Sequence, residues 1–158
     1  MNILVLCTGN SARSILLEAI LNRDGAGRVL AFSAGSKPAG RVHPRSLALL
    51  AAKGFDTAGL RSKSWDEFAG PDAPAMDLVI TVCGSAAGET CPMWPGAPLR
   101  AHWGVEDPAS TADADAPAAF EAAFSALNAR AARFLGLPLE TLDRATLSRE
   151  IGAIGVEA

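Results

Sequence analysis

Eight consecutive residues near the amino terminus combine a nucleophile, a cation and a glycine: Cys7, Thr8, Gly9, Asn10, Ser11, Ala12, Arg13 and Ser14. The backbone N–H groups of such a loop can converge on one tetrahedral oxyanion, and a helix that begins at its end adds positive potential. We therefore predict that residues 7–14 bind a phosphate-sized anion. We expect Gly9 to allow the tight curve of the loop.

Cys7 is the candidate nucleophile of this loop. The loop, Arg13 and the Ser14 hydroxyl favour the thiolate, so we expect the pKa of Cys7 to lie below the value of ~8.5 for free cysteine. Arg13 offers two parallel donors to the anion, which lysine does not. The competing interpretation is a buried cysteine that ends a strand and a solvated arginine. The C-x5-R spacing between a strand and a helix favours the catalytic interpretation.

Asp107 is the candidate proton donor. A nucleophile that attacks an oxyanion needs an acid to protonate the departing oxygen. Asp107 comes soon after the last predicted strand, on the edge of the sheet where Cys7 is expected. Its position before Pro108 is equally typical of the start of a turn, and neighbouring Glu106 is a second candidate for the role.

Cys83 and Cys91 suggest redox chemistry. Seven residues separate them, among them Gly84 and Gly88, so a disulfide between them requires the segment to fold back. A thiol relay would pass from Cys7 to Cys83 and then to Cys91. The spacing alone equally allows a core cysteine and an incidental one. It does not resemble a zinc-ligand pattern, so no metal site is predicted.

The chain alternates apolar strands with amphipathic helices, which predicts an α/β fold with a parallel sheet covered on both faces. In such sheets ligands lie at the carboxyl ends of the strands, where Cys7 and Cys83 fall. The predicted strands are residues 2–6, 28–33, 78–82 and 99–103, and the predicted helices begin near residues 13, 44, 65, 120 and 138. We expect a mobile Ala-rich loop over residues 109–119.

Composition limits the remaining possibilities. The 158 residues, 49% hydrophobic and 20% charged, suit one domain with a real core. A net charge of −3, from 14 basic and 17 acidic residues, argues against nucleic-acid binding. No apolar stretch approaches the ~20 residues of a membrane span, and no signal peptide is seen. We expect a cytoplasmic monomer.

Several ordered blocks resemble the low-molecular-weight tyrosine phosphatase fold, and specifically its arsenate reductase branch. The blocks are residues 5–14, 33–35, 79–83, 91–92 and 102–108. The resemblance implies a three-layer α-β-α sandwich around a four-stranded, mostly parallel sheet. It divides the chain into a phosphatase-like domain, residues 1–137, and a C-terminal helical extension, residues 138–158.

The resemblance also implies roles. Cys7 is then the nucleophile, Arg13 and the loop bind the oxyanion, Asp107 is the general acid, and Cys83 and Cys91 form the redox pair. The implied reaction reduces arsenate to arsenite in arsenic detoxification, with phosphate or sulfate as analogues. No cofactor is tightly bound, and the final disulfide is reduced by thioredoxin or by a glutathione–glutaredoxin or mycothiol system.

Some relatives bind potassium through residues matching Asn10, Glu18 and Ser33 and a further carboxylate. Lys63 takes the place of that carboxylate here. Since an ammonium group can replace the ion, potassium is not expected to be required.

Two other functions remain open. A phosphotyrosine phosphatase shares the loop and Asp107 but needs neither Cys83 nor Cys91, and Ala109 and Ser110 stand where phosphatases carry aromatic residues. Weak phosphatase activity remains an expected side reaction. A non-catalytic oxyanion sensor is the third possibility. Trp94 and Trp103 are expected to be partly buried, although Trp94 could also help to dock a reductase.

Overall fold

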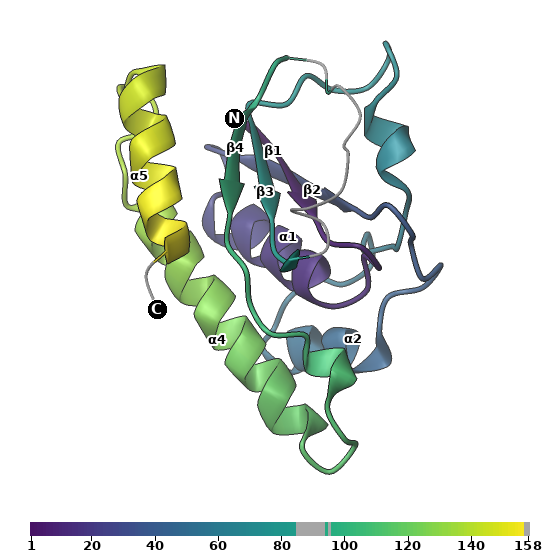
Figure 1. Cartoon of the computed structure of the whole chain (residues 1–158). Coiled ribbons are helices and arrows are strands. Elements are labelled where there is room, and N and C mark those ends of the chain that lie inside the picture. Colours follow the sequence, from purple (N-terminus) through teal and green to yellow (C-terminus); the bar gives the residue numbers. More distant parts are fainter. Residues whose placement is uncertain (85–93, 95, 157–158) are drawn as a thin grey trace.

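The computed structural model describes residues 1–84, 94 and 96–156. Figure 1 shows its helices and strands. Along the chain they are β1 (Asn2–Leu6), α1 (Arg13–Asp24), β2 (Leu30–Ala34), α2 (Pro44–Ala52), the 3-10 helix η1 (Trp65–Phe68), β3 (Leu78–Thr81), β4 (Leu99–His102), the 3-10 helix η2 (Pro108–Ser110), α4 (Ala116–Leu135) and α5 (Arg144–Val156).

The four strands form one parallel sheet in the order β2-β1-β3-β4. Leu6, the last residue of β1, pairs with Ala34 of β2 and Thr81 of β3, and Thr81 pairs with His102 of β4. All four strands therefore end at the same edge of the sheet. The predicted α/β fold with a central parallel sheet is confirmed.

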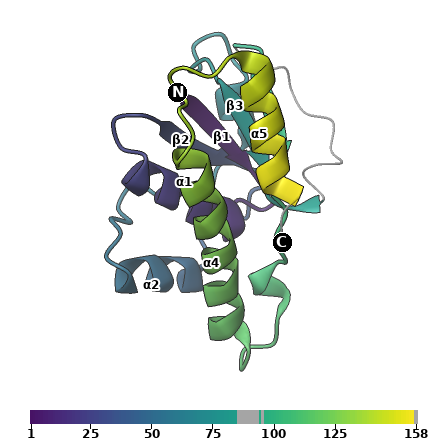
Figure 2. The same cartoon turned by 90° about the vertical axis from the view of Figure 1, so that its left-hand side faces the viewer.

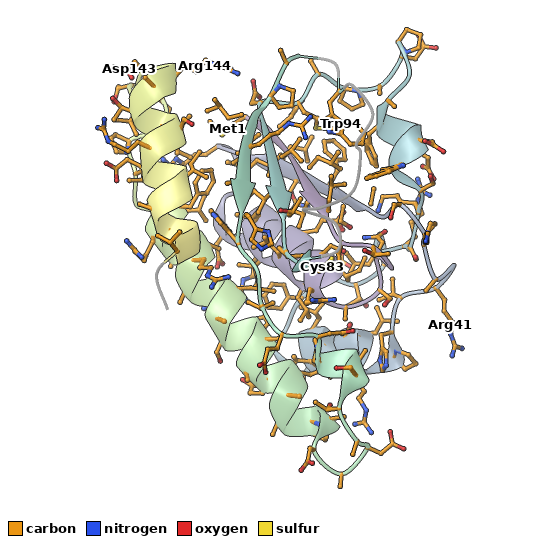
Figure 3. The ribbon with its side chains drawn as sticks, in the orientation of Figure 1. Met1, Arg41, Cys83, Trp94, Asp143 and Arg144 are labelled. Atoms are coloured by element: carbon orange, nitrogen blue, oxygen red, sulfur yellow. The ribbon has the colours of Figure 1, made fainter. Side chains whose placement is uncertain are left out.

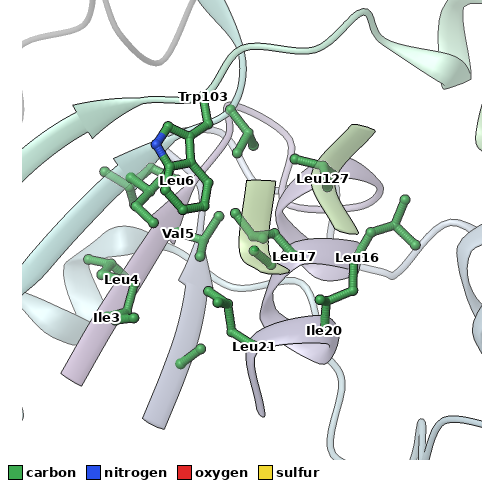
Figure 4. Close-up of a cluster of buried hydrophobic side chains, with 14 of the residues drawn as sticks. Ile3, Leu4, Val5, Leu6, Leu16, Leu17, Ile20, Leu21, Trp103 and Leu127 are labelled. Atoms are coloured by element: carbon green, nitrogen blue, oxygen red, sulfur yellow. The ribbon is translucent and has the colours of Figure 1, made fainter. Parts of the chain in front are cut away.

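Helices α1 and α4 cover one face of the sheet. The run of branched apolar residues in β1 is buried on both faces, as is usual for a central parallel strand. Figure 4 shows part of the hydrophobic core, with buried side chains from β1, α1, α4 and the residue after β4: Ile3, Leu4, Val5, Leu6, Leu16, Leu17, Ile20, Leu21, Leu127 and Trp103. This core fixes β1 and α1, and with them the loop between the two elements.

The opposite face is covered by η1 and the residues around it. Neighbouring residues of a strand point to opposite faces, and Ser33 is bonded to Asn10 beside α1, whereas Phe32 packs against Phe68 of η1. Trp65 of η1 in turn packs against Trp94, with 6.1 Å between the ring centroids. Trp94 and Trp103 are both buried, as expected for packing residues.

Several boundaries differ from the sequence prediction. The helix predicted to begin near residue 138 begins at Arg144, and β3 and β4 each end one residue earlier than predicted. Strand β2 begins at Leu30 rather than residue 28, because the N–H groups of Arg28 and Val29 both bond to the carbonyl of Gly25 in the turn after α1. Helix α4 begins at Ala116, inside the predicted mobile loop, with a proline in its first turn. Proline lacks an N–H and suits that position, where no helical acceptor exists.

Helix α5 lies alongside β4, the outermost strand of the sheet (Figures 1 and 2). In the described part of the chain, no helix is both long and apolar enough to span a bilayer.

Candidate active site

The anion loop, residues 7–14, joins β1 to α1 and starts at the carboxyl edge of the sheet. The N–H of Cys7 donates to the carbonyl of Ala34 at 3.2 Å, which continues the pairing of β1 with β2. Gly35 follows Ala34 and touches the loop backbone. A methyl group at Gly35 would overlap the carbonyl oxygen of Thr8 and lie 2.6 Å from that of Cys7. Only glycine therefore allows this approach.

Asn10, not Gly9, turns the anion loop. Asn10 has φ +45°, whereas a methyl group at Gly9 would find its nearest neighbour at 3.8 Å. The Asn10 amide donates to the hydroxyls of Ser14 (2.8 Å) and Ser33 (3.0 Å), and its oxygen accepts the Lys63 N–H at 2.9 Å. The prediction about Gly9 is wrong because this side-chain network offsets the cost of the left-handed conformation.

The carbonyl groups of the anion loop are bound from outside by residues 37–46. The N–H groups of Lys37, Ala39 and His43 donate to the carbonyls of loop residues 8, 9 and 11 at 2.9–3.0 Å. The hydroxyls of Ser46 and Ser62 add bonds to loop carbonyls. Carbonyls held outward leave the N–H groups for an anion. The sequence analysis missed this support, because backbone bonds leave no trace in residue type.

Arg13 opens α1 and carries a free donor. The N-cap residue, Ala12, has no side chain to cap the helix, so the first N–H groups of α1 are available to an anion. The Arg13 Nη1 atom donates to the carbonyl of Val105 at 3.0 Å. Its Nε atom is buried and has no partner among the described residues. A buried, unbonded guanidinium donor is costly without a ligand, which supports an oxyanion here.

Asp107 lies beside Arg13. The distance from Arg13 Nη2 to Asp107 Oδ2 is 3.7 Å, and the Asp107 side chain is 42% exposed. The other carboxylate oxygen accepts the N–H of Ala109 at 3.0 Å and caps η2. Asp107 therefore begins a turn and also lies beside Arg13, and its role as proton donor stays a prediction. Glu106 is exposed, and no contact with Arg13 is seen for it.

Cys83 follows β3 and lies next to Cys7. Figure 3 places Cys83 at the carboxyl end of β3. Its sulfur accepts the N–H of Thr8 at 3.4 Å and lies 3.7 Å from the Thr8 hydroxyl, which places it against the residue that follows Cys7. Cys91, the third predicted redox cysteine, lies outside the described residues.

The neighbouring sulfur changes the acidity of Cys7. Its hydrogen bond with Cys83 and its burial raise the pKa of Cys7 above the ordinary value, whereas Arg13 and the N–H of Gly9 lower it. The first two effects are larger, so the predicted low pKa of Cys7 is wrong in this structure. The prediction counted only the charges of the anion loop and left out Cys83.

Glu18 and Lys63 form a buried ion pair beneath the anion loop. Their side chains are 9% and 7% exposed, with 3.7 Å between Oε1 and Nζ. Burial raises the pKa of Glu18 and lowers that of Lys63, and each partner opposes the shift of the other. Ser33 lies between the pair and Asn10: its hydroxyl accepts the Asn10 amide, and its interaction with Glu18 lowers the pKa of that carboxyl. Lys63 thus supports the turn of the loop through both its backbone and its side chain.

The pattern of the low molecular weight phosphotyrosine protein phosphatase family matches residues 2–150. The chain belongs to this family. An arsenate reductase of Bacillus licheniformis is 37% identical over 105 residues, which cover 66% of this chain and 71% of that protein. A glutaredoxin arsenate reductase of Synechocystis is 31% identical over 106 residues, 67% of this chain and 77% of that protein.

Solved structures agree with this family assignment. An arsenate reductase in a phosphate-binding state superposes with a TM-score of 0.69 at 26% identity, over 85% of this chain and 95% of that one.

This low molecular weight phosphatase family member brings most of its predicted site residues together. Cys7, Arg13, Asp107 and Cys83 meet at one edge of the sheet around the anion loop. In the described ranges, no group of three or more His, Cys, Asp and Glu residues is placed to hold a metal ion. A second sulfur, that of Cys83, lies against the residue that follows the nucleophile.

Proposed function

We propose that this protein is an arsenate reductase that converts arsenate to arsenite through Cys7, Cys83 and Cys91. One observation carries the proposal: the Cys83 sulfur accepts the N–H of Thr8, the residue that follows Cys7, at the start of the anion loop. Hydrolysis of a phosphate ester needs only the Cys7 sulfur. A second sulfur in contact with the nucleophile suits a reaction that ends in a disulfide.

The first step joins arsenate to Cys7. The thiolate attacks arsenic(V), a sulfur–arsenic bond forms, and one arsenate oxygen leaves as water after Asp107 gives it a proton. The loop N–H groups and Arg13 hold the remaining oxygens and stabilise the charge that develops on them. The free Nε atom of Arg13 supports this role, since it is a buried donor in need of an acceptor.

The second step reduces the arsenic. The Cys83 thiolate attacks the Cys7 sulfur, and the bond between that sulfur and arsenic breaks with its electron pair left on arsenic. Arsenic(V) becomes arsenic(III), arsenite departs, and a disulfide joins Cys7 to Cys83. Cys91 then attacks Cys83 and releases the Cys7 thiolate. An external thiol donor reduces the resulting Cys83–Cys91 disulfide, and we propose thioredoxin, a glutaredoxin–glutathione system or mycothiol for this role.

Arsenite production by the purified protein tests the proposal. Wild type, Cys83→Ser and Cys91→Ser are supplied with arsenate and, in parallel, with thioredoxin plus its reductase, glutathione plus glutaredoxin, or mycothiol with its partner enzymes. We expect turnover with at least one system and its loss in both variants. No arsenite with any system, together with aryl phosphate hydrolysis that survives both substitutions but not Cys7→Ser, would make the protein a phosphatase.

Asp107→Asn tests the general acid. We expect turnover to fall by ~10²–10⁴-fold, the usual contribution of a placed proton donor, while phosphate still protects Cys7 from alkylation. Glu106→Gln is the matched control, because Glu106 is exposed and lies one residue away. An equal loss in both variants would contradict the role of Asp107.

We propose that the Lys63 ammonium replaces a potassium ion beneath the anion loop. It lies 3.7 Å from Glu18 and donates to the carbonyl of Arg61 at 3.1 Å. We expect the same turnover in potassium and sodium buffers of equal ionic strength, and a several-fold rise with potassium would refute this.

Removing one member of a buried ion pair costs about 3–5 kcal/mol. Lys63→Met should therefore unfold at lower urea, with Glu18→Leu/Lys63→Met recovering part of the loss.

The need for a thiol donor also bears on location and assembly. Thioredoxin and glutathione systems operate in reducing compartments, so we propose that the protein works in the cytoplasm. We further propose that it acts as a monomer, since Cys7, Arg13, Asp107 and Cys83 come from one chain.

A further inference from the structure

Helix α5 contacts the end of β4 through backbone and indole groups. The indole N–H of Trp103, which is fully buried, donates to the carbonyl of Ile151 at 3.1 Å. A methyl group at Gly155 would overlap the carbonyl oxygen of His102 and lie 2.9 Å from the Trp103 ring. The helix therefore approaches the strand as closely as glycine permits. Figures 1 and 2 show α5 running beside β4.

The residues that follow Trp103 lead directly to the anion site. The carbonyl of Gly104 accepts Arg130 Nη1 at 2.8 Å. The N–H of Val105 donates to Val82 at 3.2 Å, and its carbonyl accepts Arg13 Nη1 at 3.0 Å. Asp107 lies two residues further. A displacement of the chain at Trp103 would thus move both the acceptor that orients Arg13 and the proposed acid.

An open pocket lies beside this connecting segment, whereas Val105 packs against the hydrophobic core. A cavity of about 310 Å³ lies between residues 104–108 and the alanine-rich face of α4. A segment beside a cavity can shift more easily than one packed on all sides. Its place is set by its hydrogen bonds and by the anchor at its start, where α5 holds Trp103.

We infer that α5 is a positioning element for the active site, and that Gly155 is the contact through which it sets the place of residues 103–107. The inference rests on the proposed roles of Arg13 and Asp107. The helix touches none of the reacting atoms. Its effect passes from Gly155 and Ile151 to Trp103, and from there along the backbone to Val105 and Asp107.

Gly155→Ala and Gly152→Ala form a matched pair for the test. Both substitutions replace a glycine of α5 by alanine and raise helix propensity equally. The methyl group at Gly152 meets nothing within 4 Å, whereas that at Gly155 meets the backbone of β4. Wild type and both variants are compared by thermal unfolding, arsenate turnover and the concentration of inorganic phosphate that half-protects Cys7 from iodoacetamide.

We expect a loss of kcat confined to Gly155→Ala. A misplacement of about 1 Å in catalytic groups can cost ~10²-fold, so kcat should fall by roughly 10- to 100-fold. Phosphate protection should weaken less than kcat falls, because residues 37–46 support the anion loop independently and only the orientation of Arg13 is affected. Gly152→Ala should match wild type. Hydrogen exchange at residues 103–107 should be faster in Gly155→Ala than in Gly152→Ala.

Other outcomes overturn the inference. A folded Gly155→Ala variant with wild-type kcat would do so, and so would parallel losses of kcat and phosphate protection, which indicate general damage. If Gly155→Ala does not fold, Trp103→Phe removes the bond to Ile151 and is judged by the same measurements. Inactivity of wild type itself would contradict the proposed function, and hydrogen exchange would still report on the role of α5.

Discussion

The proximity of Cys83 determines when Cys7 becomes a thiolate. Cys83 raises the pKa of Cys7 through a hydrogen bond, against the lowering effect of Arg13. Because the larger effect comes from the second sulfur, we predict that Cys83→Ala lowers the pKa of Cys7. In a Cys91→Ser background, the pH at which iodoacetamide reacts half-maximally should fall in Cys83→Ala. An unchanged or higher midpoint would show that Cys83 does not govern the acidity of Cys7.

Gly35 and Gly9 should respond differently to an added methyl group, with a loss of stability expected only for Gly35→Ala. Gly35→Ala forces a carbon against the carbonyls of Thr8 and Cys7, whereas Gly9→Ala enters open space at an ordinary φ. Overpacking of this kind costs about 1–3 kcal/mol, so Gly35→Ala should lower both urea stability and turnover. Gly9→Ala should remain within about 1 kcal/mol of wild type. Comparable losses in the two variants would refute the assignment of the close approach to Gly35.

Residue types predicted the members of the site better than its conformation. Spacing predicts Cys7 and Arg13, the family resemblance adds Asp107 and Cys83, and the four residues lie together. The φ of Asn10 and the contact between Cys83 and Cys7 depend on partners far away in the sequence. Neither the network around Asn10 nor the second sulfur beside the nucleophile is visible in a local pattern.

At the scale of elements, one arginine connects the beginning and the end of the fold. The Arg28 guanidinium donates to the carbonyls of Leu135 (2.6 Å) and Leu137 (2.9 Å) at the end of α4, and pairs with Glu140. The N-terminal ammonium group also donates to the Arg28 carbonyl at 3.0 Å. Arg28 thus supplies donors to carbonyls that the end of a helix leaves without donor partners.

We predict that Arg28→Ala lowers the urea concentration at which the protein unfolds, because it removes hydrogen bonds to two carbonyls. Glu140→Gln removes only an exposed ion pair and should lower that concentration less. Arg41→Ala is the control, since Figure 3 shows the Arg41 side chain pointing away from the body of the protein. Urea denaturation measures all three. A larger loss in Glu140→Gln than in Arg28→Ala would contradict the capping role.

Strands were easier to predict than the places where elements begin. Each predicted strand exists, because continuous apolar runs between glycines and polar turns have few other solutions. The start of α4 was missed because alanine, aspartate and proline suit both a loop and a first helical turn. The division of the chain into residues 1–137 and 138–158 stays a prediction, and the packing of α5 against β4 gives the second part a structural role.

At the scale of the whole molecule, anion binding should raise the free energy of unfolding. A ligand at 100 times its Kd stabilises the folded state by ~2.7 kcal/mol, and 1 kcal/mol corresponds to roughly 2–4 °C in a domain of this size. We predict that saturating inorganic phosphate raises Tm by roughly 5–10 °C. Chloride at equal ionic strength is the control.

Arg13→Ala should abolish most of this gain, because it removes the buried Nε donor. In chloride, Arg13→Ala should change Tm only through its own effect on stability. The difference in Tm between phosphate and chloride is therefore the quantity to compare. A phosphate response that survives in Arg13→Ala would place the anion elsewhere.

The outward-held carbonyls of the anion loop have a consequence for how the site chooses between similar anions. Residues 37–46 hold the anion loop in shape. Its backbone N–H groups recognise the charge and the tetrahedral shape of an anion, but they do not distinguish phosphorus from arsenic. Phosphate, abundant in every cell, will compete for the same place as scarce arsenate. Selectivity must then arise after binding, at Cys83, since only an anion whose central atom accepts two electrons can complete the turnover.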